Sequence, residues 1–457
     1  MACWASLPAE LAQEIVHLAL EADADSAPKF ATISRVWQIF VEQKTFSSIR
    51  IRSTQVPELH NMMTPFRQSL VRNINFEVIL AEYDMKRCKE KETEEEQEQN
   101  SRSFTVGMFQ LFDHLATWTS MSGGKAEQQP RVSLKVSSSS PSDSQSDTPL
   151  VGSVACAKRR WRWGTSILEL VQDDKRNLPL LLGISEFLCD KNYYPCRKIS
   201  LKACCDIFAR LPNVQTLEFY SPDDGGSRLP RDFIAGLQMI PNSVRHVTLL
   251  HSRHDRGAVP WGFRPHPGNS WAPGPLSVAL YHLARRLVKL DIDSDCIYPE
   301  FFWPVSAMMI SSRSPEQPLY FPYLEEIRFG KLNVSSSQVF KGPNLRFKYP
   351  FDIYLLATAQ VVREMPRLKR CVIEWDFRAL YQGLEYQIFR DGAPRALLTV
   401  WGEPPIPLSG RVKNAWLRTT EVLLGSRDKM EVKLRDDIER DPHLDKVDPI
   451  TFTSYTT

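Results

Sequence analysis

Five segments of the chain repeat one spacing of apolar residues, in which a second anchor follows the first after three positions and a third follows after five. Successive side chains of a strand point to opposite faces, so the second and third anchors share a face. The pattern therefore predicts strands with one buried side. The sets are Val214/Leu217/Phe219, Val244/Val247/Leu249, Leu287/Leu290/Ile292, Leu324/Ile327/Phe329 and Leu368/Cys371/Ile373, with an earlier one at Val71/Ile74/Phe76.

Helical spacing precedes four of these five strands. The apolar positions that share a helical face lie within 204–211, 233–240, 276–287 and 355–362; before the strand at Leu324, the spacing of Phe301, Val305 and Met308 is less clear. Helix and strand in alternation predict an α/β fold in which stacked units form a parallel sheet, that is, a solenoid. An ordinary α/β domain whose strands share this register is the alternative.

Residues between the anchors are expected to face outward in rows across the sheet. Such an open face is where solenoids bind partners. The mixture of charged and apolar types suits a protein or peptide better than a phosphate backbone. The candidate target-binding residues are Glu218, Tyr220, Thr248, Asp291, Asp293, Arg328 and Glu374.

The first fifty residues contain two helical patterns that are rich in large apolar residues. Leu7, Leu11, Ile15 and Leu18 follow one another on one face of the first helix, and a second face runs from Phe30 to Phe40. A segment of this size buries little surface alone, so it must cover something. It packs either on the rest of this chain, as a cap, or on another protein.

The sequence LPAEL with Ile15, followed by ISRVW, resembles the F-box. That resemblance implies a helical motif over residues 1–50 that docks on the Skp-type adaptor of a cullin–RING ubiquitin ligase. By the same resemblance Leu7, Pro8, Leu11, Ile15, Val36 and Trp37 occupy adaptor-facing or F-box core positions.

The repeated strands resemble leucine-rich repeats, although the distances between their first anchors, 30, 43, 37 and 44 residues, are longer and less regular. The order of the motifs resembles fungal F-box proteins: LPAEL, then Leu70–Ile74, Ser140–Asp143, Glu300–Pro304 and a mixed C-terminal unit.

The domain organisation follows from these patterns. Residues 51–380 are expected to form an irregular leucine-rich-repeat-like solenoid, with mobile insertions near 86–103 and 137–160. Residues 381–457 are expected to form a small α+β unit in the order ββαβ that covers the end of the solenoid. Its hairpin turns at Asp391 and Gly392, its helix ends at Gly425, and its last strand begins near Met430.

Composition narrows the function classes. The 57 basic and 54 acidic residues give a formal net charge of +3, which is too small for a general nucleic-acid or membrane partner. The basic–aromatic stretch KRRWRWG at 158–164 favours a packed core over stacking on bases. The nine cysteines form no CxxC pair and are expected to be reduced. The start of the chain does not resemble a signal peptide, so a cytoplasmic or nuclear location is expected.

No catalytic motif stands out. GxSxG, HExxH, GxxxxGK[ST] and GxGxxG are missing from the sequence, and we expect no catalytic residue, metal or cofactor. His246, His251 and His254 are close in sequence, but they are expected to lie in strand and loop rather than in a metal site. We expect a substrate-receptor subunit of a ubiquitin ligase. The alternatives are a leucine-rich-repeat-like scaffold that does not act in ubiquitination, and an enzyme of unrecognised type.

Overall fold

The computed structural model describes residues 8–23, 26–88, 90–120, 131–144, 162, 166–171, 177–189, 197–222, 231–252, 275–293, 321–333, 352–377, 380–402 and 408–435. The helices are α1 (Ala9–Ala22), α2 (Ala27–Phe30), α3 (Arg35–Ser47), α4 (Val56–Met62), α5 (Pro65–Leu70), α6 (Glu94–Ser120), α7 (Pro141–Ser144), α9 (Leu201–Phe208), α10 (Arg231–Met239), α11 (Pro275–Ala284), α14 (Asp352–Val362) and α15 (Gly410–Leu424). Short 3₁₀ turns are η3 (Ser53–Gln55), η4 (Met85–Arg87) and η6 (Arg427–Lys429).

The strands are β1 (Ser48–Arg52), β2 (Asn73–Ile79), β3 (Val132–Ser139), β4 (Ile167–Leu168), β5 (Ile184–Cys189), β6 (Lys198–Ile199), β7 (Thr216–Pro222), β8 (His246–Ser252), β9 (Lys289–Asp293), β10 (Glu326–Asn333), β11 (Arg370–Phe377), β12 (Leu380–Phe389), β13 (Arg395–Trp401) and β14 (Met430–Arg435). The α/β class expected from the sequence is confirmed.

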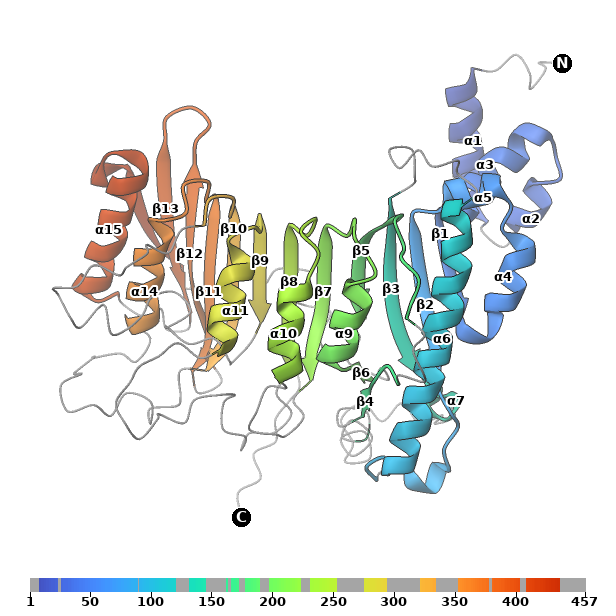
Figure 1. Ribbon diagram of the computed structural model, residues 1–457. Helices are drawn as coiled ribbons and strands as arrows, with labels where there is room; N and C mark the ends of the chain where they lie inside the picture. The colour runs from blue at the N-terminus through green and yellow to red at the C-terminus, as the bar shows by residue number, and fades with distance from the viewer. Residues whose placement is uncertain are drawn as a thin grey trace.

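One large sheet extends across the molecule from the N-terminal helices to α15 (Figure 1). Within the described residues it holds twelve strands in the order in which the chain makes them, from β1 to β14, while β4 and β6 form a separate pair. The strands from β1 to β11 run parallel. β12 is antiparallel to both β11 and β13, and β14 is parallel to β13, so the sheet is mixed.

The apolar anchors found in the sequence lie in register across five strands. The second anchors form one row, Leu217–Val247–Leu290–Ile327–Cys371, and the third anchors form the row Phe219–Leu249–Ile292–Phe329–Ile373. All of them are buried, as are the first anchors just before each strand. The predicted parallel pairing of these strands is confirmed.

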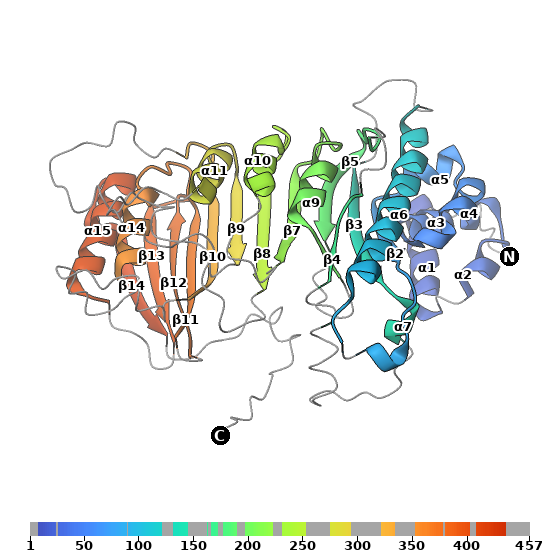
Figure 2. The same ribbon diagram turned by 60° about the horizontal axis from the view of Figure 1, so that its bottom comes forward.

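Helices cover the anchor side of the sheet. Both views show α6, α9, α10, α11, α14 and α15 along this one face (Figure 2). Their buried residues belong to the same apolar cluster as the strand anchors. The four helices predicted before the repeated strands correspond to α9, α10, α11 and α14, whereas residues 301–308 lie outside the described residues.

The charged stretch at 86–103, which we expected to be a loop, is helical from Glu94 onward. Thr93 and Glu96 form a reciprocal cap: the Thr93 hydroxyl accepts a hydrogen bond from the amide of Glu96 at 3.2 Å, and the Glu96 carboxylate accepts one from the amide of Thr93 at 2.9 Å. Three consecutive glutamates in the first turn also suit the positive end of the helix dipole. The Thr-Glu-Glu-Glu sequence was a helix start.

Part of the second expected insertion is also regular. β3 continues to Ser139, inside that insertion, and α7 follows at Pro141, so only residues 145–160 of the insertion lie outside the described residues. Sequence reasoning missed β5, which pairs in parallel with both β3 and β7. Its buried residues Ile184, Phe187 and Cys189 have the same spacing of three and five positions as the anchors of the repeat, so the sequence did contain the signal for this strand.

The C-terminal unit has the predicted order ββαβ, in β12, β13, α15 and β14. Gly392 at the hairpin and Gly425 at the end of α15 have φ values of 78° and 80°, a backbone conformation that favours glycine. Because β12 pairs with β11, this unit continues the main sheet rather than standing beside it.

Gly236 provides a test of how closely α10 packs on α9. A Cβ atom at this position would lie 2.3 Å from the sulfur of Cys205. We expect Gly236→Ala to lower the free energy of unfolding by about 1–3 kcal/mol through overpacking, although alanine is the better helix former. Urea unfolding measures this change in free energy. Gly410→Ala, whose Cβ would meet nothing within 4 Å, is the matched control; equal stability of the two variants would contradict the packing.

Candidate docking surfaces

The N-terminal helices have an apolar core of their own. Val16, Leu20, Trp37 and Val41 are buried together, in a cluster separate from that of the main sheet. The ring of Trp37 lies 5.7 Å from that of Phe30, centroid to centroid. Trp37 therefore stabilises the helical unit from inside, which fits a core position rather than an adaptor contact.

The opposite face of α1 is apolar and exposed. Leu11, Ile15 and Leu18 share this face, and their exposed fractions are 53%, 40% and 57%. Val36 at the start of α3 and Ile33 just before it are exposed as well. We call Leu11, Ile15 and Leu18 the α1 apolar surface. Of the other predicted adaptor-binding residues, Pro8 is exposed and Leu7 lies outside the described residues.

Arg67 on α5 connects the helical unit to the body of the protein. Its guanidinium lies 2.9 Å from the carboxylate of Glu42 on α3, and it stacks on the ring of Phe46 at 4.7 Å from the centroid. The hydrogen bond from Arg67 holds the pKa of Glu42 below its ordinary value. This attachment leaves the α1 apolar surface uncovered.

By strand register, most of the predicted target-binding positions fall into rows that alternate with the anchor rows; the side chains of Tyr220 and Asp293 lie outside the described part of the structure. Glu218, Thr248, Asp291 and Arg328 are consecutive partners in one row. The next row is formed by Tyr220, Leu250, Asp293 and Gly330.

Ion pairs cross this face from strand to strand. The Arg328 guanidinium lies 3.2 Å from the Asp291 carboxylate and 2.6 Å from that of Glu374 on β11. In the neighbouring row, Lys289 lies 2.9 Å from Glu326 and holds the pKa of that carboxyl below its ordinary value through a hydrogen bond. The face therefore pairs many of its own charges.

Two of the predicted target-binding residues are not open to a partner. Glu218 and Glu374 are only 9% and 8% exposed. Thr248, Asp291 and Arg328 are half-buried and remain reachable. Alternation along a strand correctly predicts the face that a side chain takes, but it says nothing of what else lies over that face.

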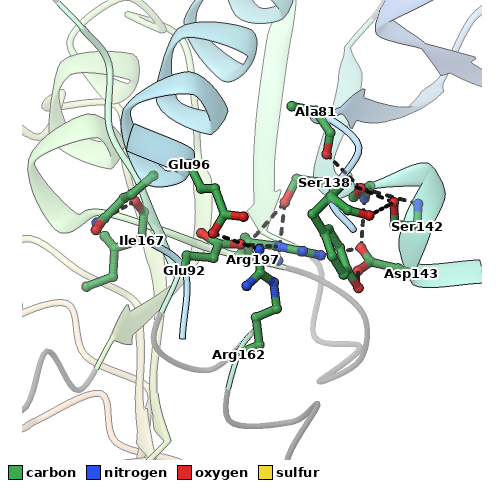
Figure 3. A network of polar contacts seen from close by, with 12 residues as sticks. Ala81, Glu92, Glu96, Ser138, Ser142, Asp143, Arg162, Ile167 and Arg197 are labelled. Carbon is green, nitrogen blue, oxygen red and sulfur yellow. Dashed lines mark hydrogen bonds and ion pairs between the residues drawn. The ribbon is translucent and has the colours of Figure 1, made fainter. Parts of the chain in front are cut away.

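A buried polar network, which sequence reasoning missed, lies beyond the ends of β2 and β3 (Figure 3). The Arg197 guanidinium forms ion pairs with Asp143 and Glu92, and all three side chains are almost wholly buried. The Tyr83 hydroxyl donates a hydrogen bond to Asp143 at 2.9 Å. Burial disfavours the charged guanidinium, but the two carboxylates outweigh it and raise the pKa of Arg197.

The same network incorporates the Ser-Pro-Ser-Asp segment and the basic stretch near Arg162. The Ser140 and Ser142 hydroxyls donate to the carbonyls of Ala81 and Tyr83 at 2.7 and 2.9 Å. Arg162 lies 3.0 Å from Glu96 and stacks on the ring of Tyr83. These residues fasten β2, β3 and α6 to one another. Residues 163–165, including the tryptophan at 163, lie outside the described residues.

The described residues contain no cluster of three or more histidine, cysteine, aspartate or glutamate side chains able to hold a metal ion. Over the same ranges, no helix combines the length and the apolar character needed to cross a membrane. His246 lies 3.3 Å from the Thr216 hydroxyl through its Nδ1 atom.

We expect a single substitution in the buried network to lower the stability of the fold strongly. Asp143→Asn removes a charge and leaves Arg197 underpaired in the interior, and we expect it to lower the free energy of unfolding by about 3–5 kcal/mol. Urea unfolding of the full chain measures the loss. Glu98→Gln removes an exposed carboxylate, paired with Arg102 at 2.7 Å, and is expected to cost less than about 0.5 kcal/mol. Similar losses in both variants would contradict the network.

Comparison with known proteins identified no relative of this chain. No protein-family model and no curated protein matches the chain. The function is therefore inferred from the α1 apolar surface and the outer face of the sheet.

Proposed function

We propose that this chain is a substrate-receptor (F-box) subunit of a cullin–RING ubiquitin ligase. In this proposal the helical unit α1–α3 is the F-box and binds a Skp-type adaptor, and the sheet with its helices is an irregular leucine-rich-repeat-like solenoid that holds a target protein. The observation that carries the proposal is the α1 apolar surface, which is exposed on a unit that already has its own core.

Energetics support a docking role for that surface. Full burial of one large apolar side chain contributes about 1.5–3 kcal/mol, so three exposed ones on one helix face are costly to leave in water. Leu11, Ile15 and Leu18 are not needed for the internal core, which Val16, Leu20 and Trp37 fill from the other side of the helix. A helix with two apolar faces, one of them buried within its own unit, is typical of a helix that binds a partner.

The sheet supports the second half of the proposal. Among the described residues its strands follow one another in chain order and in parallel up to β11, which is the strand order expected of a solenoid. Its outer face presents Thr248, Asp291 and Arg328 to a partner. Because Arg328 is paired with Asp291 and Glu374, a target must offer charges that replace or extend these pairs.

The mechanism is one of proximity and needs no chemistry in this chain. Figure 1 places the helical unit at one end of the sheet, so adaptor and target would be held at separate sites on one framework. Tethering raises the effective concentration of target lysines near the ubiquitin-loaded arm of the ligase. Such a receptor would act in the cytoplasm or nucleus.

The test changes two exposed residues of α1. We expect Leu11→Asp combined with Ile15→Ser to abolish co-purification of the full-length chain with a Skp-type adaptor, and to leave the urea midpoint within experimental error, because neither side chain belongs to the core. Val106→Ser on α6 removes an apolar residue that is 55% exposed, and it should leave adaptor binding unchanged.

Two outcomes would count against the proposal. The unaltered chain would fail to bind the adaptor, or the double variant would bind as well as Val106→Ser does. In either case the scaffold alternative, with a partner outside ubiquitination, would remain for the sheet face.

A further inference from the structure

Within the part of the chain that the structure describes, β14 is the last strand of the large sheet. Among the described residues β14 is paired on one side only, by β13 (Figure 2). Its far side therefore presents backbone donors and acceptors that another strand can use. The predicted role of the C-terminal unit, to cover the end of the sheet, is only partly met, because the unit ends in an edge of its own.

Charged and apolar side chains alternate along β14. Glu431 and Lys433 are about half exposed on the outer face of the sheet and lie 3.4 Å apart. Met430, Val432 and Leu434 lie on the helix side, where they continue the rows of Ala396, Leu398 and Val400. Leu434 is nevertheless 61% exposed. No proline or glycine interrupts the strand, so nothing in its backbone prevents further pairing.

The strand is complementary to itself in one antiparallel register. If a two-fold axis passes beside Val432, Glu431 of one copy lies opposite Lys433 of the other, and the same pair forms again across the axis. Met430 then lies opposite Leu434, which places apolar side chains together on the helix side. Opposite charges and apolar pairs directly across from each other stabilise a sheet.

The neighbouring in-phase registers of the same strand set one charged residue against its own copy. An axis beside Lys433 would set Glu431 opposite Arg435 but would place the two lysines opposite each other, and an axis beside Glu431 would place the two glutamates opposite each other. An axis between Val432 and Lys433 would set apolar residues against charged ones. Of these registers, the one with its axis beside Val432 pairs Glu431 with Lys433 and sets neither residue against its own copy.

We propose that β14 pairs with β14 of a second copy of this chain, so that the sheet continues across a two-fold axis into a homodimer. Such an interface is isologous and closes on itself, so it gives a dimer rather than a filament. A lysine on an edge strand normally discourages pairing. Here the glutamate two residues away gives each lysine a partner in the other copy.

A charge-reversal cycle on the full-length chain tests the proposal by sedimentation equilibrium. Glu431→Lys and Lys433→Glu each create like-charged pairs on both sides of the axis, and we expect each to raise the dimer dissociation constant by about tenfold. The double variant exchanges the two charges and restores opposite pairs, so we expect a dissociation constant close to that of the unaltered chain. Arg102→Glu, an exposed reversal on α6, should have no effect.

A chain that stays monomeric at about 100 μM would overturn the proposal, since a specific dimer forms at or below that concentration. So would a dimer that neither single reversal weakens, or one that the double variant fails to restore. Urea unfolding of the same variants separates loss of pairing from loss of folding. The outcome is independent of adaptor binding, because Leu11→Asp with Ile15→Ser should leave the dimer intact.

Discussion

The rest of the structure depends on the alignment of apolar anchors between neighbouring strands. Leu217, Val247, Leu290, Ile327 and Cys371 form a continuous buried row, and a second row runs beside it. A slip of one residue in any strand would turn its anchors to the outer face, so burial fixes the register. Once the register is fixed, the rows of polar residues on the other face are fixed too, and so is the cross-strand pairing of Arg328 with Asp291.

Much of this arrangement could be predicted because its signals are local. The apolar period of two residues in a strand and the period of about 3.6 residues in a helix can both be recognised within about 15 residues. Glycines such as Gly392 and Gly425 indicate turns directly. The helical unit, the repeated strands and the order ββαβ were all predictable in this way. The cap at Thr93 and Glu96 was an equally local signal, but the acidic composition around it obscured it.

The remaining features depend on residues that are distant in sequence. Arg197 pairs with Asp143 and Glu92, which lie 54 and 105 positions away, and no spacing rule indicates such a contact. The burial of Glu374 likewise depends on a residue that is distant in sequence, because Arg328 on the neighbouring strand pairs with it. For the α1 apolar surface, periodicity identified the residues but could not tell whether the sheet would cover them.

The order of the strands in the sheet has a consequence for how the chain is made. Within the described residues, each strand of the large sheet up to β14 pairs with the strand of that sheet that precedes it in the chain, and β4 and β6 pair separately. As the chain leaves the ribosome, each new strand can therefore pair with a strand that has already folded. The sheet can form strand by strand from β1 onward, before the later strands are synthesised. Synthesis and folding can then proceed in the same direction, with α15 and β14 closing the process last.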